Sequence, residues 1–542
     1  MSVWPGRLAR AGSGLLVLGA VVAVAGAGLL APVPEDVVVV PELVPVPPGP
    51  TALVCPGPVV LPESRDDVDP EFNPAPVDSV DAARFAVGGS GGAPLDVWPL
   101  EGLDGAPVLR ADPGGTRLAQ TTPTGPLVAR AEPVDDVAPL VAASVASAVA
   151  AGDLRGTTAA ACQHPGSEHW LVGGGTQLGT TSLLLVHNPG ATPAEIGLDV
   201  WGPAGKVDLG GAARYVVPSG GELSLRLSAF APELARTVVR VTSAGGQIAA
   251  FLQVSELDGF TPGGTDLVVA GAAPAERQVV ATLSVPASQI DGPGAGRLRL
   301  LALGTGEPAG DAPEEAGSAE ADEAQTGRET VRASVTFLGA DGPVTLPGAE
   351  TVELVPDEVV DVDLGGLPAG EYAVVVEAER PVVAGTRVAR IGSPAEPGDA
   401  APVELAWTPA TPLGDGGILA LPAGLSATAV VAAVPESLSA PTGVRRGVLR
   451  AYDEAGAQVL AEDVLVTAGA ALAVPLPSGA AAVELEVEAA DDAVTGGAGL
   501  VWGVVGEAVA PDGAFVSTLS VPVRPAVVDT VAVREGQRLP LD

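Results

Sequence analysis

Apolar and acidic side chains alternate with a period of two residues through much of this 542-residue sequence. One stretch reads Val483-Glu-Leu-Glu-Val-Glu488, and another reads Val360-Asp-Val-Asp-Leu364. Successive side chains of a β-strand point to opposite faces, so this period predicts strands with one buried and one polar face. The 71 glycines and 53 prolines divide the apolar runs into short pieces. The pattern therefore predicts an all-β chain of tandem antiparallel β-sandwich domains, immunoglobulin-like in architecture.

A hairpin pattern recurs three times, as two apolar runs joined by a glycine-containing turn. The copies cover residues 198–207, 335–344 and 449–459, about 115–135 residues apart, which is the size of a domain rather than of a solenoid repeat. We therefore expect three sandwich repeats and a less regular β-rich segment before them, in which 139–151 fits a strand or a helix. The expected boundaries are 51–165 for that segment and 166–275, 276–400 and 401–525 for the repeats.

Three other segments have compositions that do not suit a packed domain. Residues 34–50 are rich in proline and valine and predict an extended stalk. Residues 305–330, inside the second repeat, are acidic and almost without large apolar side chains, so we expect a disordered insertion. Residues 526–542 form the expected C-terminal tail.

The N-terminus predicts export. Arg7 and Arg10 lie in a short cytoplasmic segment, 1–10, and precede an uncharged apolar run over 11–33. The run is long enough to cross a bilayer as one transmembrane helix, and the basic flank places the N-terminus in the cytoplasm. A cleaved signal peptide is the alternative, and the chain would then be secreted. Either reading places the remainder outside the cytosol, as a single-pass membrane protein or as a secreted one.

The charge of the chain argues against one class of partner. The formal net charge is −39, and 27 basic residues stand against 66 acidic ones. Nucleic-acid affinity rests on basic groups that displace counterions, so nucleic acid is not an expected partner. An acidic, self-repelling ectodomain suits this charge.

The two cysteines, Cys55 and Cys162, both follow the N-terminal apolar run. In an oxidising compartment we expect them to form a disulfide. The alternative is two unrelated buried thiols, because the sequence does not give their separation.

Four segments have a distinctive sequence: 53–58, around Cys55, and 161–175, 181–190 and 198–205. In these segments the sequence resembles an actinobacterial family of secreted or membrane-anchored proteins, the domain-of-unknown-function family 5719. The resemblance implies an envelope location, tandem β domains and an envelope-glycan context. It implies no activity.

No pattern in the sequence predicts a catalytic centre, a metal or a cofactor. His164 and His169 are five residues apart, which does not match a zinc helix, although a site with Glu168 is conceivable. Residues 88–92 match the nucleophile-elbow pattern in a glycine-rich turn without the required strand and helix. Asp66, Asp67 and Asp69 offer oxygen ligands for calcium but lack the spacing of a calcium loop, so we interpret them as linker.

Hydrolysis of a glycoside needs paired carboxylates, and binding of a sugar often uses an aromatic surface. Asp361, Asp363 and the Glu484–Glu488 ladder fit solvated strand faces better than the paired carboxylates of a glycosidase. Trp170 and Trp201 form a weak candidate platform for a sugar, with packing in the sandwich core as the alternative.

The sequence therefore predicts a non-enzymatic structural or interaction protein of the cell envelope that binds an envelope protein or a glycan. A carbohydrate-binding accessory for envelope polysaccharide synthesis is the second reading, and a hydrolase with an unrecognised carboxylate site is the third. The sequence does not indicate an oligomeric state.

Overall fold

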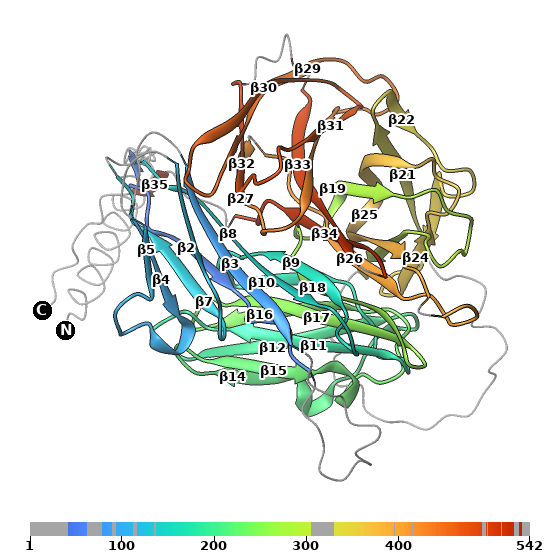
Figure 1. The fold of residues 1–542 in the computed structure, drawn as a ribbon, viewed down its shortest axis with the longest axis horizontal. Coiled ribbons are helices and arrows are strands. Elements are labelled where there is room, and N and C mark those ends of the chain that lie inside the picture. The colour runs from blue at the N-terminus through green and yellow to red at the C-terminus, as the bar shows by residue number, and fades with distance from the viewer. Residues whose placement is uncertain are drawn as a thin grey trace, which may run out of the picture. The chain divides into compact units, whose positions relative to one another are not determined.

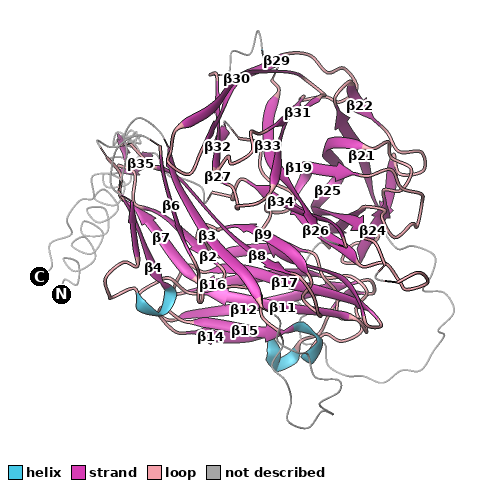
Figure 2. Cartoon of the chain, in the orientation of Figure 1, coloured by secondary structure: helices cyan, strands magenta, loops and turns pink. Residues whose placement is uncertain are grey.

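The fold is described from a computed structural model of the chain. It describes residues 42–61, 78–88, 94–111, 116–134, 137–304, 330–394, 396–414, 416–489, 495, 497–510, 512–524 and 530–533. Antiparallel strands dominate these residues, and short 3-10 helices interrupt them (Figure 2). The prediction of an all-β chain is confirmed.

The N-terminal predictions fall largely outside this description. Residues 1–10 and 11–33 are not among the described residues, and neither is most of the acidic insertion at 305–330. No helix within the described ranges has the length and apolar character needed to cross a membrane.

A small unit contains parts of the expected stalk and tail. Strand β1 (Glu42–Pro45) pairs antiparallel with β35 (Thr530–Val533), with Glu42 opposite Val533. At these residues the chain is therefore a two-stranded ribbon instead of an unpaired stalk. The valines of both segments suit a strand at least as well as an extended coil.

The larger unit, Pro48–Val527, contains four two-sheet repeats. The first, in the segment expected to be less regular, has the sheets β2-β7-β4-β5 and β6-β3-β8-β9. The ambiguous 139–151 run forms a central strand, β8. Its elements are β2 (Thr51–Cys55), β3 (Ser79–Gly88), β4 (Leu95–Pro99), η2 (Leu100–Gly102), β5 (Leu109–Ala111), β6 (Arg117–Thr121), β7 (Leu127–Ala131), β8 (Leu140–Val149) and β9 (Gly156–Ala161).

The second repeat has the same two-sheet arrangement. One sheet is β10-β16-β12-β13, with β14 also paired to β12, and the other is β15-β11-β17-β18. Its elements are β10 (Glu168–Val172), β11 (Thr180–His187), β12 (Ala194–Gly202), β13 (Gly205–Lys206), η3 (Gly210–Ala213), β14 (Arg214–Val217), β15 (Glu222–Arg226), η4 (Leu227–Ala229), β16 (Val238–Ala244), β17 (Ala249–Asp258) and β18 (Thr261–Val269).

The third repeat joins its two sheets through one long strand. The first half of β25 pairs with β19 and β21, and its second half pairs with β20 and β26, so the strand crosses from one sheet to the other near Pro381. Its elements are β19 (Ala275–Val285), β20 (Arg297–Ala302), β21 (Val331–Gly339), β22 (Gly342–Val344), β23 (Thr351–Leu354), β24 (Val359–Asp363), β25 (Gly370–Ile391) and β26 (Val403–Pro409).

The fourth repeat has the sheets β27-β32-β29-β30 and β31-β28-β33-β34. Its strands are β27 (Gly416–Ala420), β28 (Ser426–Val434), β29 (Val444–Tyr452), β30 (Gln458–Thr467), β31 (Ala471–Pro475), β32 (Ala482–Val487), β33 (Gly499–Ala510) and β34 (Gly513–Ser520). The three hairpins predicted from the sequence are confirmed as β12–β13, β21–β22 and β29–β30.

Neighbouring repeats share hydrophobic cores. The core of the first repeat, around Phe85, also contains Phe251 of β17 in the second repeat. The core of the second, around Leu184, also contains Trp407 of β26 in the third. Each repeat therefore packs against the next through a sheet face that an isolated sandwich would leave in water.

The packing continues around to the first repeat. A core of the third repeat includes Val501 and Val516 of the fourth. The core of the fourth includes Ala159 and Ala161 of β9, in the first repeat. Arg84 of β3 reinforces this last junction by donating a hydrogen bond of 2.8 Å from Nη1 to the carbonyl oxygen of Leu421. The four repeats therefore form a closed ring.

The last strand of each repeat lies at the centre of the ring. β9 contacts β18, β18 contacts β26, β26 contacts β34 and β34 contacts β9. These four labels lie close together near the middle of Figure 1. We call β9, β18, β26 and β34 the inner strands. β9 is buried along its whole length, and most residues of β18 and β26 are buried too, although β9 and β18 are edge strands of their sheets.

The first repeat contains the predicted disulfide between Cys55 and Cys162, with a Cα–Cα distance of 4.4 Å and a sequence separation of 107. Both cysteines are fully buried. The bond joins the end of β2 to the residue after β9, so it fixes an inner strand to the opposite sheet of its own repeat.

We expect the double variant Cys55→Ala/Cys162→Ala to be less stable than the natural chain by about 2–5 kcal/mol, because it removes a cross-link closing a loop of 107 residues. Urea unfolding of both proteins, with and without reductant, measures the difference. Reductant should lower the midpoint of the natural chain alone. An unchanged midpoint for the natural chain in reductant would contradict the assignment.

Candidate functional site

The two tryptophans proposed as a sugar platform are buried. Trp170 and Trp201 are 2% and 3% exposed, and their rings stack with centroids 5.3 Å apart. They pack with Leu301 and Val383 of the third repeat, at the junction between the second and third repeats. Neither ring has a face open to a sugar, so the geometry favours the alternative in which they pack the core.

The histidines have separate roles in the fold. His169 Nε2 lies 2.7 Å from the carbonyl oxygen of Ile248, and His164 Nδ1 lies 3.0 Å from that of Ala52. Burial, assisted by the charge of Arg524, lowers the pKa of His164 to about 4. Glu168 is paired with an arginine. No cluster of His, Cys, Asp or Glu that could hold a metal occurs among the residues that the structure describes.

The acidic strand faces are paired more closely than the sequence predicted. Asp361 accepts hydrogen bonds of 2.7 and 2.9 Å from the guanidinium of Arg299, its cross-strand neighbour on β20. Arg299 is 3% exposed, so Asp361 neutralises a buried cation. Glu484 accepts a hydrogen bond of 2.9 Å from the hydroxyl of Tyr452. The expectation of merely solvated acids was wrong here, because arginine and tyrosine on adjacent strands lie within reach.

Two other sequence candidates cannot be placed. The elbow-like turn at 88–92 lies outside the described residues except for Gly88. The acidic triplet Asp66, Asp67 and Asp69 lies in 62–77, which is also outside them.

Sequence reasoning missed a cluster of charged residues at the centre of the ring. We call Arg155, Asp266, Glu404 and Asp512 the central polar junction. Asp266 lies on β18 and Glu404 on β26, whereas Arg155 directly precedes β9 and Asp512 directly precedes β34. The four inner strands therefore bring together one charged residue from each repeat.

Arg155 connects three repeats. Its Nε and Nη2 donate to the two carboxylate oxygens of Asp512 at 2.5 and 2.8 Å, and its Nη1 lies 3.6 Å from Oε2 of Glu404. The guanidinium also lies over the ring of Phe515, 4.9 Å from its centroid. The bidentate contact joins the first repeat to the fourth, with the geometry that makes arginine–carboxylate pairs strong.

The two buried carboxyls join inner strands through the backbone. Oε1 of Glu404 accepts the backbone N–H of Thr157 on β9 at 2.7 Å, and Oδ2 of Asp266 accepts that of Trp407 on β26 at 2.6 Å. The hydroxyl of Thr408 on β26 donates to that of Thr518 on β34 at 2.9 Å. These three bonds therefore link the third repeat to the first, to the second and to the fourth.

Burial decides the protonation of these acids. It raises the pKa of Asp266 to about 7, although the backbone N–H groups of Trp407 and Leu267 oppose the shift. It also raises the pKa of Glu404 well above its usual value, against the N–H of Thr157 and the charge of Arg155. The hydrogen bonds from Arg155 lower the pKa of Asp512 instead.

Two carboxyls with raised pKa values are a pattern seen at catalytic sites. Here Asp266 is 2% exposed, Glu404 1% and Arg155 3%, so a substrate has no approach to them. The arrangement can hold strands together and bind or release protons. One feature of the sequence indicates it, because Glu404 and Asp266 are isolated acids in otherwise uncharged strands.

Comparison with known proteins places the chain in a family. Residues 118–477 match the profile of a family described as "Family of unknown function (DUF5719)". The chain belongs to this family. The match runs from the first repeat into the fourth. The family region of this DUF5719 member therefore includes most of the ring and three of the four residues of the central polar junction, Arg155, Asp266 and Glu404.

Other comparisons add little. No curated protein matches the chain. A solved Streptomyces avermitilis alpha-L-rhamnosidase, complexed with L-rhamnose, is 10% identical with a TM-score of 0.12. That alignment covers 76% of this chain and 55% of the rhamnosidase chain. A similarity at this score carries no argument about fold or activity.

We expect Arg155→Met to lower the free energy of unfolding by about 2 kcal/mol or more, because it leaves the carboxylate of Asp512 and the buried Glu404 without their cation. Urea unfolding measures the loss. Arg110→Met is the matched control, since Arg110 also makes a bidentate contact, with Asp96, but is 61% exposed. It should cost less than about 1 kcal/mol. Equal losses for the two variants would contradict a special role for the junction.

The raised pKa of Asp266 predicts a pH dependence. Between its unfolded value near 3.8 and about 7, the folded chain retains a proton that the unfolded chain releases, so stability falls as pH rises. The slope for one group is roughly 1.4 kcal/mol per pH unit. Asp266→Asn removes this titration, so its stability should fall less than that of the natural chain from pH 4.5 to 7.5. Parallel stability curves for the two proteins in urea would show that Asp266 ionises normally.

Proposed function

We propose that this DUF5719 member is an extracytoplasmic structural or interaction protein of the cell envelope without a catalytic centre of its own. The observation that carries the proposal is the structural role of two acids in the central polar junction, Asp266 and Glu404. Both are almost completely buried and bonded to the backbone of neighbouring inner strands. Convergent carboxyls that hold a ring together are unsuited to turnover, because catalysis needs a reacting atom within reach of them.

Export is supported by two independent features. The Cys55–Cys162 disulfide suits an oxidising compartment, where such bonds form and persist. The apolar run at 11–33, after Arg7 and Arg10, suits an N-terminal membrane anchor, with a cleaved signal peptide as the alternative.

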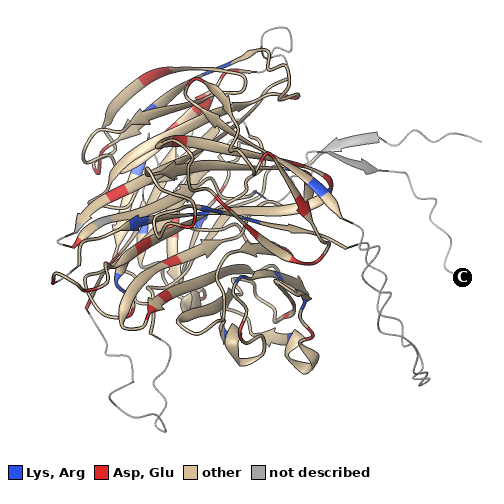
Figure 3. Cartoon of the chain, turned by 90° about the vertical axis from the view of Figure 1, so that its right-hand side faces the viewer, with Lys and Arg blue, Asp and Glu red and all other residues tan. Residues whose placement is uncertain are grey.

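The acidic surface suits a protein that stays soluble while presenting recognition surfaces. Asp and Glu are distributed over many strands and loops of the fold instead of forming one patch (Figure 3). Loop tips and strand edges at the rim are the surfaces on which β-sandwich proteins recognise partners. We propose an envelope protein or an envelope glycan as the partner. For a glycan, Trp170 and Trp201 are poor contacts because they are buried.

A topology experiment tests the location. Alkaline phosphatase, which is active only after export, is fused to the C-terminus of the full-length chain in its native host. We expect phosphatase activity, and we expect a cytosol-active reporter at the same position to be silent. The opposite pattern would overturn the extracytoplasmic placement.

A second experiment tests the role. Photo-crosslinking in the native host should capture an envelope protein or polysaccharide on the full-length chain, and Glu404→Gln should leave the crosslinks in place. Turnover of envelope polysaccharide by the purified chain that is abolished by Glu404→Gln would instead establish a hydrolase.

A further inference from the structure

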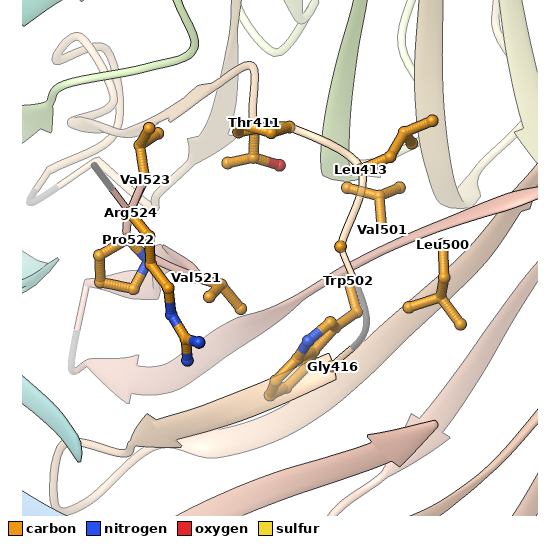
Figure 4. Close-up of a pocket in the computed structure, with 12 residues that line it drawn as sticks. Thr411, Leu413, Gly416, Leu500, Val501, Trp502, Val521, Pro522, Val523 and Arg524 are labelled. Carbon is orange, nitrogen blue, oxygen red and sulfur yellow. The ribbon is translucent and has the colours of Figure 1, made fainter. Parts of the chain in front are cut away.

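A cavity of 190 Å³ lies in the fourth repeat, away from the central polar junction. Its walls come from the segment between β26 and β27, from β33 and from the residues after β34 (Figure 4). The cavity is smaller than the roughly 300–1,000 Å³ of sites for drug-sized ligands. It exceeds the roughly 150 Å³ cavity that holds benzene, so it has room for a small molecule or for one end of a larger one.

The polar groups of this cavity include donors that the protein itself leaves unused. Trp502 and Thr411 are 3% and 6% exposed, and both line the cavity. Neither the indole Nε1 of Trp502 nor the hydroxyl of Thr411 has a hydrogen-bond partner among the described residues. Burying such groups unpaired costs about 1–3 kcal/mol each, so a ligand that accepts their hydrogen bonds recovers that cost.

Arg524 adds a positive charge to the donors of Trp502 and Thr411. The guanidinium of Arg524 points toward the indole of Trp502 across the cavity, and Thr411 lies on a third side (Figure 4). Arg524 is exposed and makes no ion pair with a described residue. None of the twelve described residues that line the cavity is acidic, and Asp415, between Gly414 and Gly416, lies outside the described residues. The planar guanidinium of Arg524 suits a carboxylate from a ligand.

The apolar walls of the cavity favour an aliphatic group in the remainder of the ligand. Leu413, Leu500, Val501, Val521 and Val523 give the cavity an aliphatic surface. A phosphate or sulfate ion would lose its hydration against these side chains and gain one arginine. A carboxylate attached to a short aliphatic group instead meets donors at one end and hydrocarbon at the other.

We propose that this cavity is a binding site for an aliphatic carboxylate, held by Arg524 through its charge and by Trp502 and Thr411 through hydrogen bonds. The ligand is either a small free acid or the C-terminal residue of a polypeptide, which present the same chemistry. The site does not depend on the proposed function, because its geometry is the same wherever the chain resides.

The test uses the full-length chain labelled with ¹⁵N-tryptophan and titrated with N-acetyl-L-leucine. We expect a saturable shift of the Trp502 indole N–H resonance, which is assigned by its loss in Trp502→Phe. The Kd should be on the order of millimolar for so small a ligand. The neutral N-acetyl-L-leucinamide should bind at least about tenfold more weakly, because it lacks the charge that Arg524 recognises.

Variants separate the site from general effects on folding. Arg524→Gln changes an exposed side chain and should weaken binding about tenfold, and Thr411→Val should weaken it several-fold while keeping the side-chain shape. Arg214→Gln, which removes another exposed arginine in the second repeat, should leave the affinity unchanged. Three results would each overturn the proposal: no shift of the Trp502 resonance, equal binding of the amide, or full binding by Arg524→Gln.

Two further ligands identify the source of the carboxylate. An octapeptide that ends in leucine should bind more tightly than isovalerate if the natural ligand is a polypeptide C-terminus. Comparable affinities would indicate a small free acid. Binding of neither ligand would contradict the proposal.

Discussion

Burial of both faces of the inner strands is the constraint on which the larger unit depends. In an isolated repeat, the sheet that contains the inner strand would have one face in water. In the ring, the neighbouring repeat covers that face. A polar group on β9, β18, β26 or β34 then destabilises the fold unless it finds a partner inside the protein. The central polar junction supplies such partners for the carboxyls of Asp266, Glu404 and Asp512, through bonds between residues that are far apart in the sequence.

The same constraint explains how an acidic chain uses its few cations. Arg84, Arg155 and Arg299 are each at most 4% exposed, and each donates to groups on another strand or another repeat. Arginine suits this work because it stays charged when buried and its planar fork can bond several oxygens. These three cations thus serve the interior, while other arginines, such as Arg110 and Arg214, remain exposed.

Much of the fold could be predicted from local sequence, and the site could not. In the hairpin at 198–207 and its two counterparts, the alternation and the glycine-containing turn lie within about ten residues. The local sequence therefore predicts the pairing of their strands. The first repeat lacks that clear hairpin pattern, and its similarity to the others emerges from strand order alone. Glu404 follows the alternation rule that usually indicates a wet face, and only closure of the ring, an interaction across hundreds of residues, buries it. Trp502 and Arg524 likewise meet only in the folded chain.

The bidentate contact of Arg155 with Asp512 spans 357 positions, so the partner that closes the first repeat is synthesised long after Arg155. A nascent chain that emerges from its N-terminus presents the alanine-lined face of β9 long before the fourth repeat exists to cover it. Assembly is therefore not vectorial: the earliest repeat is also the last to be completed. Until the fourth repeat is made, this apolar surface is exposed and prone to aggregation, and a chain truncated before β34 keeps it exposed.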